Sequence, residues 1–193
     1  EDLPDLLPCL GAARVKLAVW NSEGDVESAK EIDFPKLLEA LRDARITPTA
    51  CLIAPPPRVA AAIGGPTWQH LLKAKPETWQ PQLSYLVSRY SGYLDRWQLG
   101  LDAEAQQFVT DGSMRQTYSQ VHGQFRKLVD RPDLAMPWPA WFDMEGELPA
   151  TVALSVPSDV LPQQLPLYID DLKRTEGQQL SVSLQLLPRE QYG

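Results

Sequence analysis

Six runs of mostly apolar residues recur along the chain, and they predict buried strands. Several of them are apolar nearly throughout instead of alternating, which is typical of parallel strands that are covered on both faces. Proline lacks a backbone N–H and clusters where these runs end, so it marks strand ends and loop starts. The runs are RVKLAVW (14–20), PTACLIA (48–54), DRWQLGL (95–101), LAMPWPAW (134–141), TVALSV (151–156) and LSVSLQLL (180–187).

Segments with apolar residues at helical spacing lie between these runs. The clearest is 77–94, in which Trp79, Leu83, Leu86 and Tyr90 fall on one face of a helix. Strands that alternate with helices indicate an α/β fold with a parallel sheet. The other predicted helices cover 34–45, 114–130 and 163–174.

Two parallel architectures fit this alternation, a doubly wound open sheet and a (β/α)8 barrel. No glycine-rich GxGxxG or Walker loop follows a predicted strand, so the nucleotide-binding pattern of many open sheets is missing. Acids, tryptophans and prolines gather at the ends of the runs, where barrel enzymes hold their chemistry. A complete barrel needs about 250 residues. We therefore expect a partial (β/α)8 barrel in one domain over residues 1–193, and we read the chain, which starts with Glu, as a segment of a longer protein.

Composition and charge narrow the function classes. The chain is 44% hydrophobic and carries a formal charge of -7, which argues against nucleic acid and anionic membrane surfaces as partners. No apolar run is long enough to span a membrane. His70 and His122 stand in unrelated patterns, so we expect neither a metal site nor a cofactor. Cys9 and Cys51 form no CxxC motif; a buried free thiol is expected for Cys51, and a disulfide between the two stays open.

Two carboxylates, Asp102 and Glu104, come directly after the run 95–101, with only Ala103 between them. A carboxyl group in a half-buried cleft has a raised pKa, which suits it to protonate a leaving group. These residues are therefore candidate catalytic acids. The structural alternative is that Asp102 caps a short helix that begins near Ala103.

Further polar and aromatic residues at strand ends are candidates for binding a substrate. Trp138 and Trp141, followed by Asp143, end the run 134–141; flat aromatic faces stack on sugar rings, but Trp138 could equally fill the core. At the end of the first run, Trp20, Asn21 and Glu23 could contact sugar hydroxyls, or Asn21 could form an Asx turn before Gly24.

The segment WQPQLSYLVSRYSGYLDRWQLGLDAE (79–104) resembles the helix–strand unit of clan A (β/α)8 glycoside hydrolases. In those enzymes a helix with an Arg-Tyr pair leads to a short strand, W-x-[IL]-x-N-E, whose Glu is the general acid/base. The segment IDFPKLLEALRDARITPTACLIAPPP (32–57) is similar to the run from their second helix to their third strand. The resemblance implies that the predicted strands are the second to the seventh of a barrel.

The same resemblance assigns roles to single residues. It places Leu101 at the Asn position and Asp102 at the acid/base position, or Glu104 after a shift of two residues. At the end of the seventh strand it places Gln185 where the family has its nucleophilic Glu, and a Gln cannot attack an anomeric carbon. It implies a carbohydrate ligand and favours an extracytoplasmic location.

Three functions remain open at this stage. The first is a carbohydrate-active barrel with Asp102 or Glu104 as proton donor. The second is a non-catalytic barrel that binds polysaccharide or serves as a scaffold in a larger protein, and the third is a doubly wound domain with an unrelated ligand. On either barrel hypothesis, Trp20, Asp102, Trp138 and Gln185 are expected to point toward one common mouth.

Overall fold

Six parallel strands form a sheet in the order in which they occur along the chain. In this computed structural model, residues 3–9, 11–27, 32–129, 133–142, 151–156 and 179–184 are described, with single positions at 160, 163–164, 166–167 and 169. The parallel strands are β1 (Arg14–Asn21), β3 (Thr47–Leu52), β4 (Arg96–Leu99), β5 (Asp133–Pro139), β6 (Thr151–Val156) and β7 (Gln179–Leu184). A short strand, β2 (Gly24–Asp25), pairs antiparallel with the end of β1. The six predicted runs are thus confirmed as strands, and their order does not reverse as it would in a doubly wound sheet.

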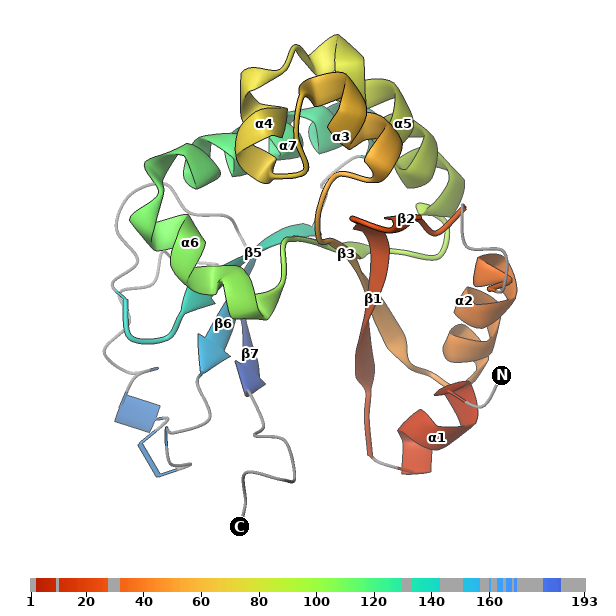
Figure 1. Ribbon diagram of the computed structural model, residues 1–193. Coiled ribbons are helices and arrows are strands. Elements are labelled where there is room, and N and C mark those ends of the chain that lie inside the picture. Colours follow the sequence, from red (N-terminus) through yellow and green to blue (C-terminus); the bar gives the residue numbers. More distant parts are fainter. Residues whose placement is uncertain are drawn as a thin grey trace.

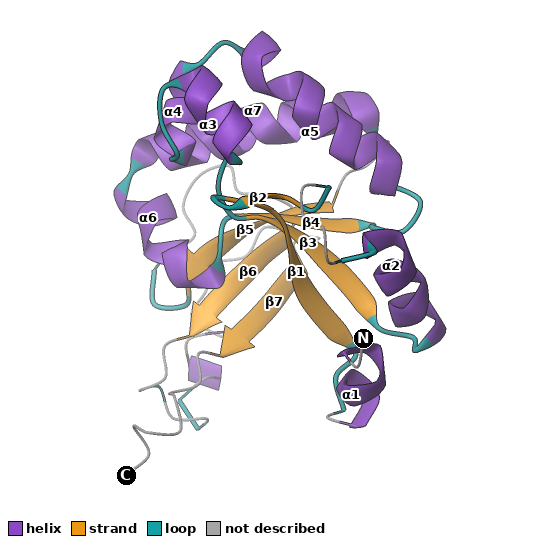
Figure 2. Cartoon of the chain, turned by 45° about the vertical axis from the view of Figure 1, so that its right-hand side comes forward, coloured by secondary structure: helices purple, strands orange, loops and turns teal. Residues whose placement is uncertain are grey.

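The helices follow one side of the sheet in an arc (Figures 1 and 2). They are α1 (Leu3–Cys9), α2 (Phe34–Asp43), α3 (Pro57–Ile63), α4 (Trp68–Lys73), α5 (Pro76–Tyr90), α6 (Ala105–Thr110) and α7 (Gly112–Leu128). In the described part of the chain, β1 and β7 form no ladder with each other, so the sheet is curved but not closed. None of the described helices combines the length and hydropathy needed to cross a membrane.

The main core lies between the sheet and these helices. Every second strand residue faces it, and Val19, Leu52, Trp97 and Leu154 are at most 2% exposed. The predicted apolar face of α5 is confirmed, because its five large residues are buried there. Burying one such side chain stabilises the fold by roughly 1.5–3 kcal/mol, so this layer supplies most of the hydrophobic stabilisation.

The other face of the sheet, called the inner face below, carries polar and small residues. The strand register aligns Lys16, Thr49, Arg96 and Asp133 in one row across β1, β3, β4 and β5. The next row is Ala18, Cys51, Gln98 and Ala135. The strands are therefore not covered by apolar layers on both faces, which corrects the interpretation of these runs as apolar throughout.

Several local predictions also change. β4 ends at Leu99, not at 101, because Gly100 adopts a φ of +82° and takes the backbone out of the ladder. The short helices α1, α3 and α4 were not predicted, whereas the short helix considered near Ala103 corresponds to the turn Asp102–Glu104 and α6. Most of the predicted helix 163–174 lies outside the described residues. Cys9 and Cys51 are both free, so the disulfide left open by the sequence is not formed.

Candidate functional site

An ion pair on the inner face joins β1 to the turn that follows β4. The Lys16 ammonium group donates to both carboxylate oxygens of Asp102, at 2.7 Å and 2.6 Å. The Gln98 amide nitrogen donates to the same carboxylate at 3.0 Å. Asp102 opens the single 3₁₀ turn Asp102–Glu104, which brings its side chain back over the end of β4. Residues 86 positions apart in sequence thus meet at one place.

Gln98 leaves one acceptor unused in this network. Its side chain is 1% exposed, and its amide nitrogen also donates to the carbonyl of Gly100 at 3.1 Å. Because both neighbours of that nitrogen are acceptors, the amide orientation is fixed, and the oxygen Oε1 points the other way. Among the described residues, no group donates to this buried oxygen. A buried acceptor without a partner costs about 1–3 kcal/mol. Because this oxygen is shielded from solvent, a ligand donor would reach it only if the side chains that cover it moved aside.

Glu104 is engaged in the turn itself. Its carboxylate accepts the backbone N–H of Leu101 at 3.0 Å, and its own N–H donates to the Leu101 carbonyl at 2.9 Å. The bond to the Glu104 carboxylate is one half of a capping box, and the other bond is the ordinary backbone bond of a 3₁₀ turn, since Leu101 has no side-chain acceptor. The capping role considered for Asp102 thus belongs to Glu104, while Asp102 is held by side chains.

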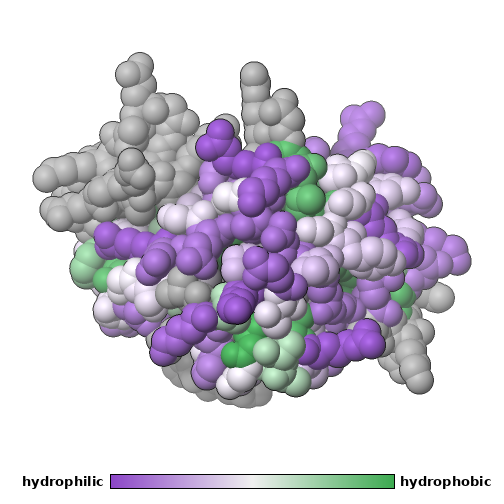
Figure 3. Space-filling view, turned by 90° about the horizontal axis from the view of Figure 1, so that it is seen from above, coloured by the Kyte–Doolittle hydropathy of each residue, from purple (hydrophilic) through white to green (hydrophobic). Residues whose placement is uncertain are grey.

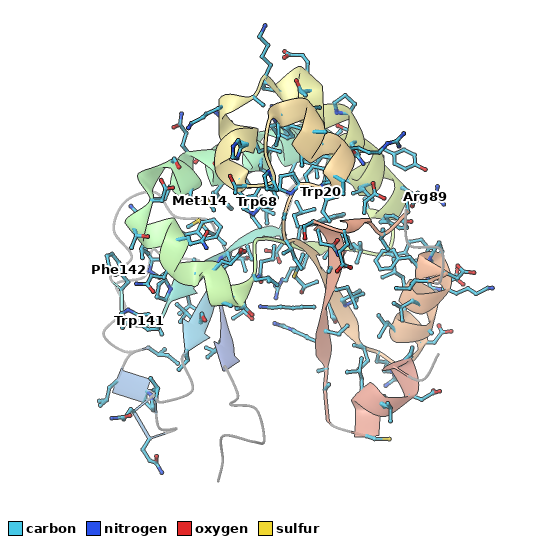
Figure 4. All side chains as sticks on the ribbon, viewed as in Figure 1. Trp20, Trp68, Arg89, Met114, Trp141 and Phe142 are labelled. Atoms are coloured by element: carbon cyan, nitrogen blue, oxygen red, sulfur yellow. The ribbon has the colours of Figure 1, made fainter. Side chains whose placement is uncertain are left out.

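Two of the four residues expected to point toward a common mouth are core residues. Trp20 and Trp138 are both 0% exposed and belong to the hydrophobic core, on the helix side of the sheet. Trp20 lies 6.4 Å from the ring of Trp68 (Figure 4), and the Trp138 indole donates to the carbonyl of Phe142 at 2.9 Å. Neither side chain can therefore line a ligand cleft, which corrects that expectation.

Exposed aromatic residues do occur at the end of β5. Trp141 is 50% exposed and Phe142 is 42% exposed, and both lie at the left-hand edge of Figure 4. β5 neighbours β4 in the sheet, and parallel strands end at the same edge. Of the two predicted tryptophans at this strand, Trp141 is therefore the one that remains available to a ligand.

Among the described residues, the predicted Asn21 and Glu23 make no contact with the Asp102 network. Asn21 forms the Asx turn left open by the sequence, because its side-chain oxygen accepts the N–H groups of Glu23 at 2.8 Å and Gly24 at 3.0 Å. Glu23 is exposed beside this turn. Asp143 and Gln185 lie outside the described residues.

Metal binding and a reactive thiol are two further kinds of chemistry to consider for the described residues at the site. The described residues include no group of three or more His, Cys, Asp or Glu side chains that could hold a metal ion. Cys51 lies on the inner face beside Gln98, but burial raises the pKa of its thiol to about 12, and Asp102 adds to this effect against the opposing charge of Lys16. The thiol is thus protonated at neutral pH and is not a nucleophile.

Lys16 and Gln98 were not singled out from the sequence, although a signal for both exists. In RVKLAVW, Lys16 alternates with Val15 and Leu17, and in DRWQLGL the amide Gln98 stands between Trp97 and Leu99. A polar residue at every second position of a strand indicates a polar face. This two-residue alternation was missed because most residues of these runs are apolar.

Comparisons with known proteins add no identification. No family model matches the sequence, and no curated protein matches it significantly. The function therefore has to be argued from the site alone.

Proposed function

We propose that the inner face of the sheet binds carbohydrate without hydrolysing it, at a site built around Lys16, Gln98 and Asp102. We further propose that the six parallel strands supply most of the wall of a (β/α)8 barrel whose mouth lies at their C-terminal ends. Sequential strand order and helices along one side of a curved sheet support the barrel part of the proposal. The observation that carries the binding part is the Lys16–Asp102–Gln98 network with its unused acceptor.

A sugar hydroxyl has the chemistry that this network lacks. A hydroxyl donates one hydrogen bond and accepts others, so a sugar hydroxyl that displaces the side chains covering Gln98 Oε1 can donate to this oxygen while it accepts from Lys16. The exposed ring of Trp141, on the neighbouring strand end, offers a flat apolar surface for a sugar ring. Polar groups that fix orientation beside an apolar surface are typical of small-molecule sites.

The same contacts argue against hydrolysis. A general acid has to carry a proton that it can give to the leaving group, and both Asp102 oxygens already accept from the Lys16 ammonium group. Glu104 is committed to the backbone of its own turn. Retaining hydrolysis needs two available carboxyl groups about 5–5.5 Å apart, and neither of these two is available.

Binding calorimetry with a panel of neutral and acidic oligosaccharides tests the proposal. We expect at least one sugar to bind, and we expect Gln98→Met to weaken that binding by tenfold or more, because methionine keeps the shape and removes the acceptor. The control Gln116→Met changes the same side chain on the exposed face of α7 and should leave binding unchanged. Thermal unfolding of each variant checks that the fold is intact.

Two results would count against the proposal. If no oligosaccharide of the panel binds, the network is a structural tie between β1 and β4, and the scaffold hypothesis takes its place. If a sugar binds equally well to a folded Gln98→Met variant, binding occurs elsewhere on the molecule.

A further inference from the structure

A pocket of about 430 Å³ lies between the two outermost parallel strands, β1 and β7. It is lined by Arg14 and Lys16 of β1, by Thr49 and Arg96 of the next two strands, and by Ser181 of β7. Lys16 therefore belongs both to this pocket and to the Asp102 network. Ligand pockets typically measure about 300–1,000 Å³, so the space suits one sugar unit or a short oligosaccharide.

The charge of the pocket is opposite to that of the molecule. The chain carries a formal charge of -7, yet the described residues that line this pocket include three basic side chains and no acidic ones. Two of the three are paired, Lys16 with Asp102 at 2.6 Å and Arg96 with Asp133 at 2.6 Å. Counted over the described residues and these two ion pairs, three cations against two carboxylates leave a local charge of +1. Hollows lined by one sign of charge focus the field on an oppositely charged ligand.

Arg14 supplies the unpaired cation. It is exposed at the start of β1, and no ion pair involves it in the described part of the chain. A guanidinium group binds carboxylate or sulfate through two parallel hydrogen bonds, and the hydroxyl groups of Thr49 and Ser181 can donate to the same anion. The surface over the helices is mostly hydrophilic with small, separate hydrophobic patches (Figure 3). A pocket of about 550 Å³ beside α3 and α5 differs in charge, because Asp25 and Glu27 line it together with Arg58.

We propose that the pocket binds the anionic group of an acidic sugar, so that the carbohydrate taken by the inner face is a uronate- or sulfate-bearing oligosaccharide. This inference rests on the proposed carbohydrate binding. Lys16 links the two regions: the anion lies against Arg14, Lys16 and Arg96, and hydroxyl groups of the same chain reach Gln98 and Asp102. The negative net charge of the molecule then repels acidic polysaccharides in general, whereas the pocket binds a short acidic oligosaccharide segment.

The experiment compares sugars that differ in charge alone. Binding of oligogalacturonate, its fully methyl-esterified form and a sulfated oligosaccharide is measured by calorimetry at low and high salt, together with the neutral panel. We expect an acidic sugar to bind at least tenfold tighter than its uncharged counterpart, and we expect high salt to reduce this preference. A preference for galacturonate identifies the group as a carboxylate, and a preference for the sulfated sugar identifies it as a sulfate ester.

Two arginine variants locate the anion. Arg14→Gln should remove most of the preference, whereas Arg126→Gln, the same change on an exposed face of α7, should leave it intact. Both positions are exposed, so neither change threatens the fold. Equal binding of charged and neutral sugars, or a preference that survives Arg14→Gln, overturns this inference and leaves carbohydrate binding standing. Failure of every sugar in the panel overturns both.

Discussion

The Lys16–Asp102 pair is half-sheltered from water, since the two side chains are 33% and 21% exposed. Partial burial strengthens the attraction, but it also makes an unpaired charge costly. A double-mutant cycle with Lys16→Met and Asp102→Asn should therefore give a coupling energy of about 1 kcal/mol in the free energy of unfolding. Denaturant unfolding of the two single variants and the double variant measures it.

The Lys36–Asp33 pair provides the matched control. Its atoms lie 2.9 Å apart, but the side chains are 80% and 52% exposed, so solvent screens the interaction. The same cycle at this pair should give no measurable coupling. If the Lys16–Asp102 cycle also gives none, the contact on the inner face does not persist in solution, and the proposed site loses its centre.

The two cysteines differ in exposure, and this predicts different reactivity. Cys9 is exposed, whereas Cys51 is buried and the pKa of its thiol is raised to about 12. Only the thiolate reacts with disulfide reagents. At pH 8, Ellman's reagent should therefore label one thiol of the native protein rapidly and the second only after unfolding. The Cys9→Ser variant should show no rapid phase; a rapid phase in that variant would mean that the inner face is open to solvent at Cys51.

At the level of single elements, the turn after β4 depends on Gly100. Its φ of +82° is unfavourable for any residue with a side chain, and an added Cβ would lie 3.2 Å from Phe108 and 3.3 Å from the Glu104 carboxylate. We expect Gly100→Ala to lower the free energy of unfolding by about 1–2 kcal/mol. The same change would weaken binding, since it displaces the turn that carries Asp102.

Gly123, in the middle of α7, is the control for this substitution. An added Cβ there meets nothing within 4 Å, and alanine is the better helix former by about 1 kcal/mol. Gly123→Ala should thus raise the free energy of unfolding. Chemical denaturation measures both variants, and a Gly100→Ala protein as stable as the original would disprove the role given to this turn.

Element prediction succeeded where the apolar pattern was long or uniform. The strand predicted at 151–156 is β6 with the same bounds, and the long apolar face at 77–94 belongs to α5. The helices α3 and α4 have seven and six residues, too short for a helical period to stand out. α3 begins at the last of three consecutive prolines, which are typical of a loop. β4 ends two residues before the predicted end at 101, because Gly100 adopts a left-handed backbone conformation. A pattern of apolar residues does not predict this conformation.

At the level of the whole molecule, strand order was predictable because short βα units place successive strands side by side. The direction of single side chains was not. If side chains alternated regularly along β1, Trp20 would lie on the inner face with Lys16 and Ala18. The pairing of β1 with β3 shifts between Ala18 and Trp20, so the Trp20 side chain lies in the core. Trp138 lies on the same face of β5 as Leu134 and Met136, which belong to the core. The sequence does not reveal which face this is, because the run is apolar throughout. Of the predicted site residues that the structure describes, Asp102 and the exposed Trp141 remain candidates, and the contacts of Asp102 with Lys16 and Gln98 came only from the fold.

The common edge of the parallel strands is also where hydrolysis would have to occur, and this gives the last prediction. Asp102 stands at that edge but is neutralised by Lys16, and Glu104 closes its own turn. We expect the protein to release no nitrophenol from a panel of aryl glycosides above the uncatalysed rate. Lys16→Met, which frees the Asp102 carboxylate from its ammonium partner, should not create turnover by itself, because a retaining mechanism also needs a nucleophile about 5–5.5 Å away. Turnover by the original protein that Asp102→Asn or Glu104→Gln abolishes would instead establish a hydrolase, with the ion pair acting as a resting contact that substrate displaces.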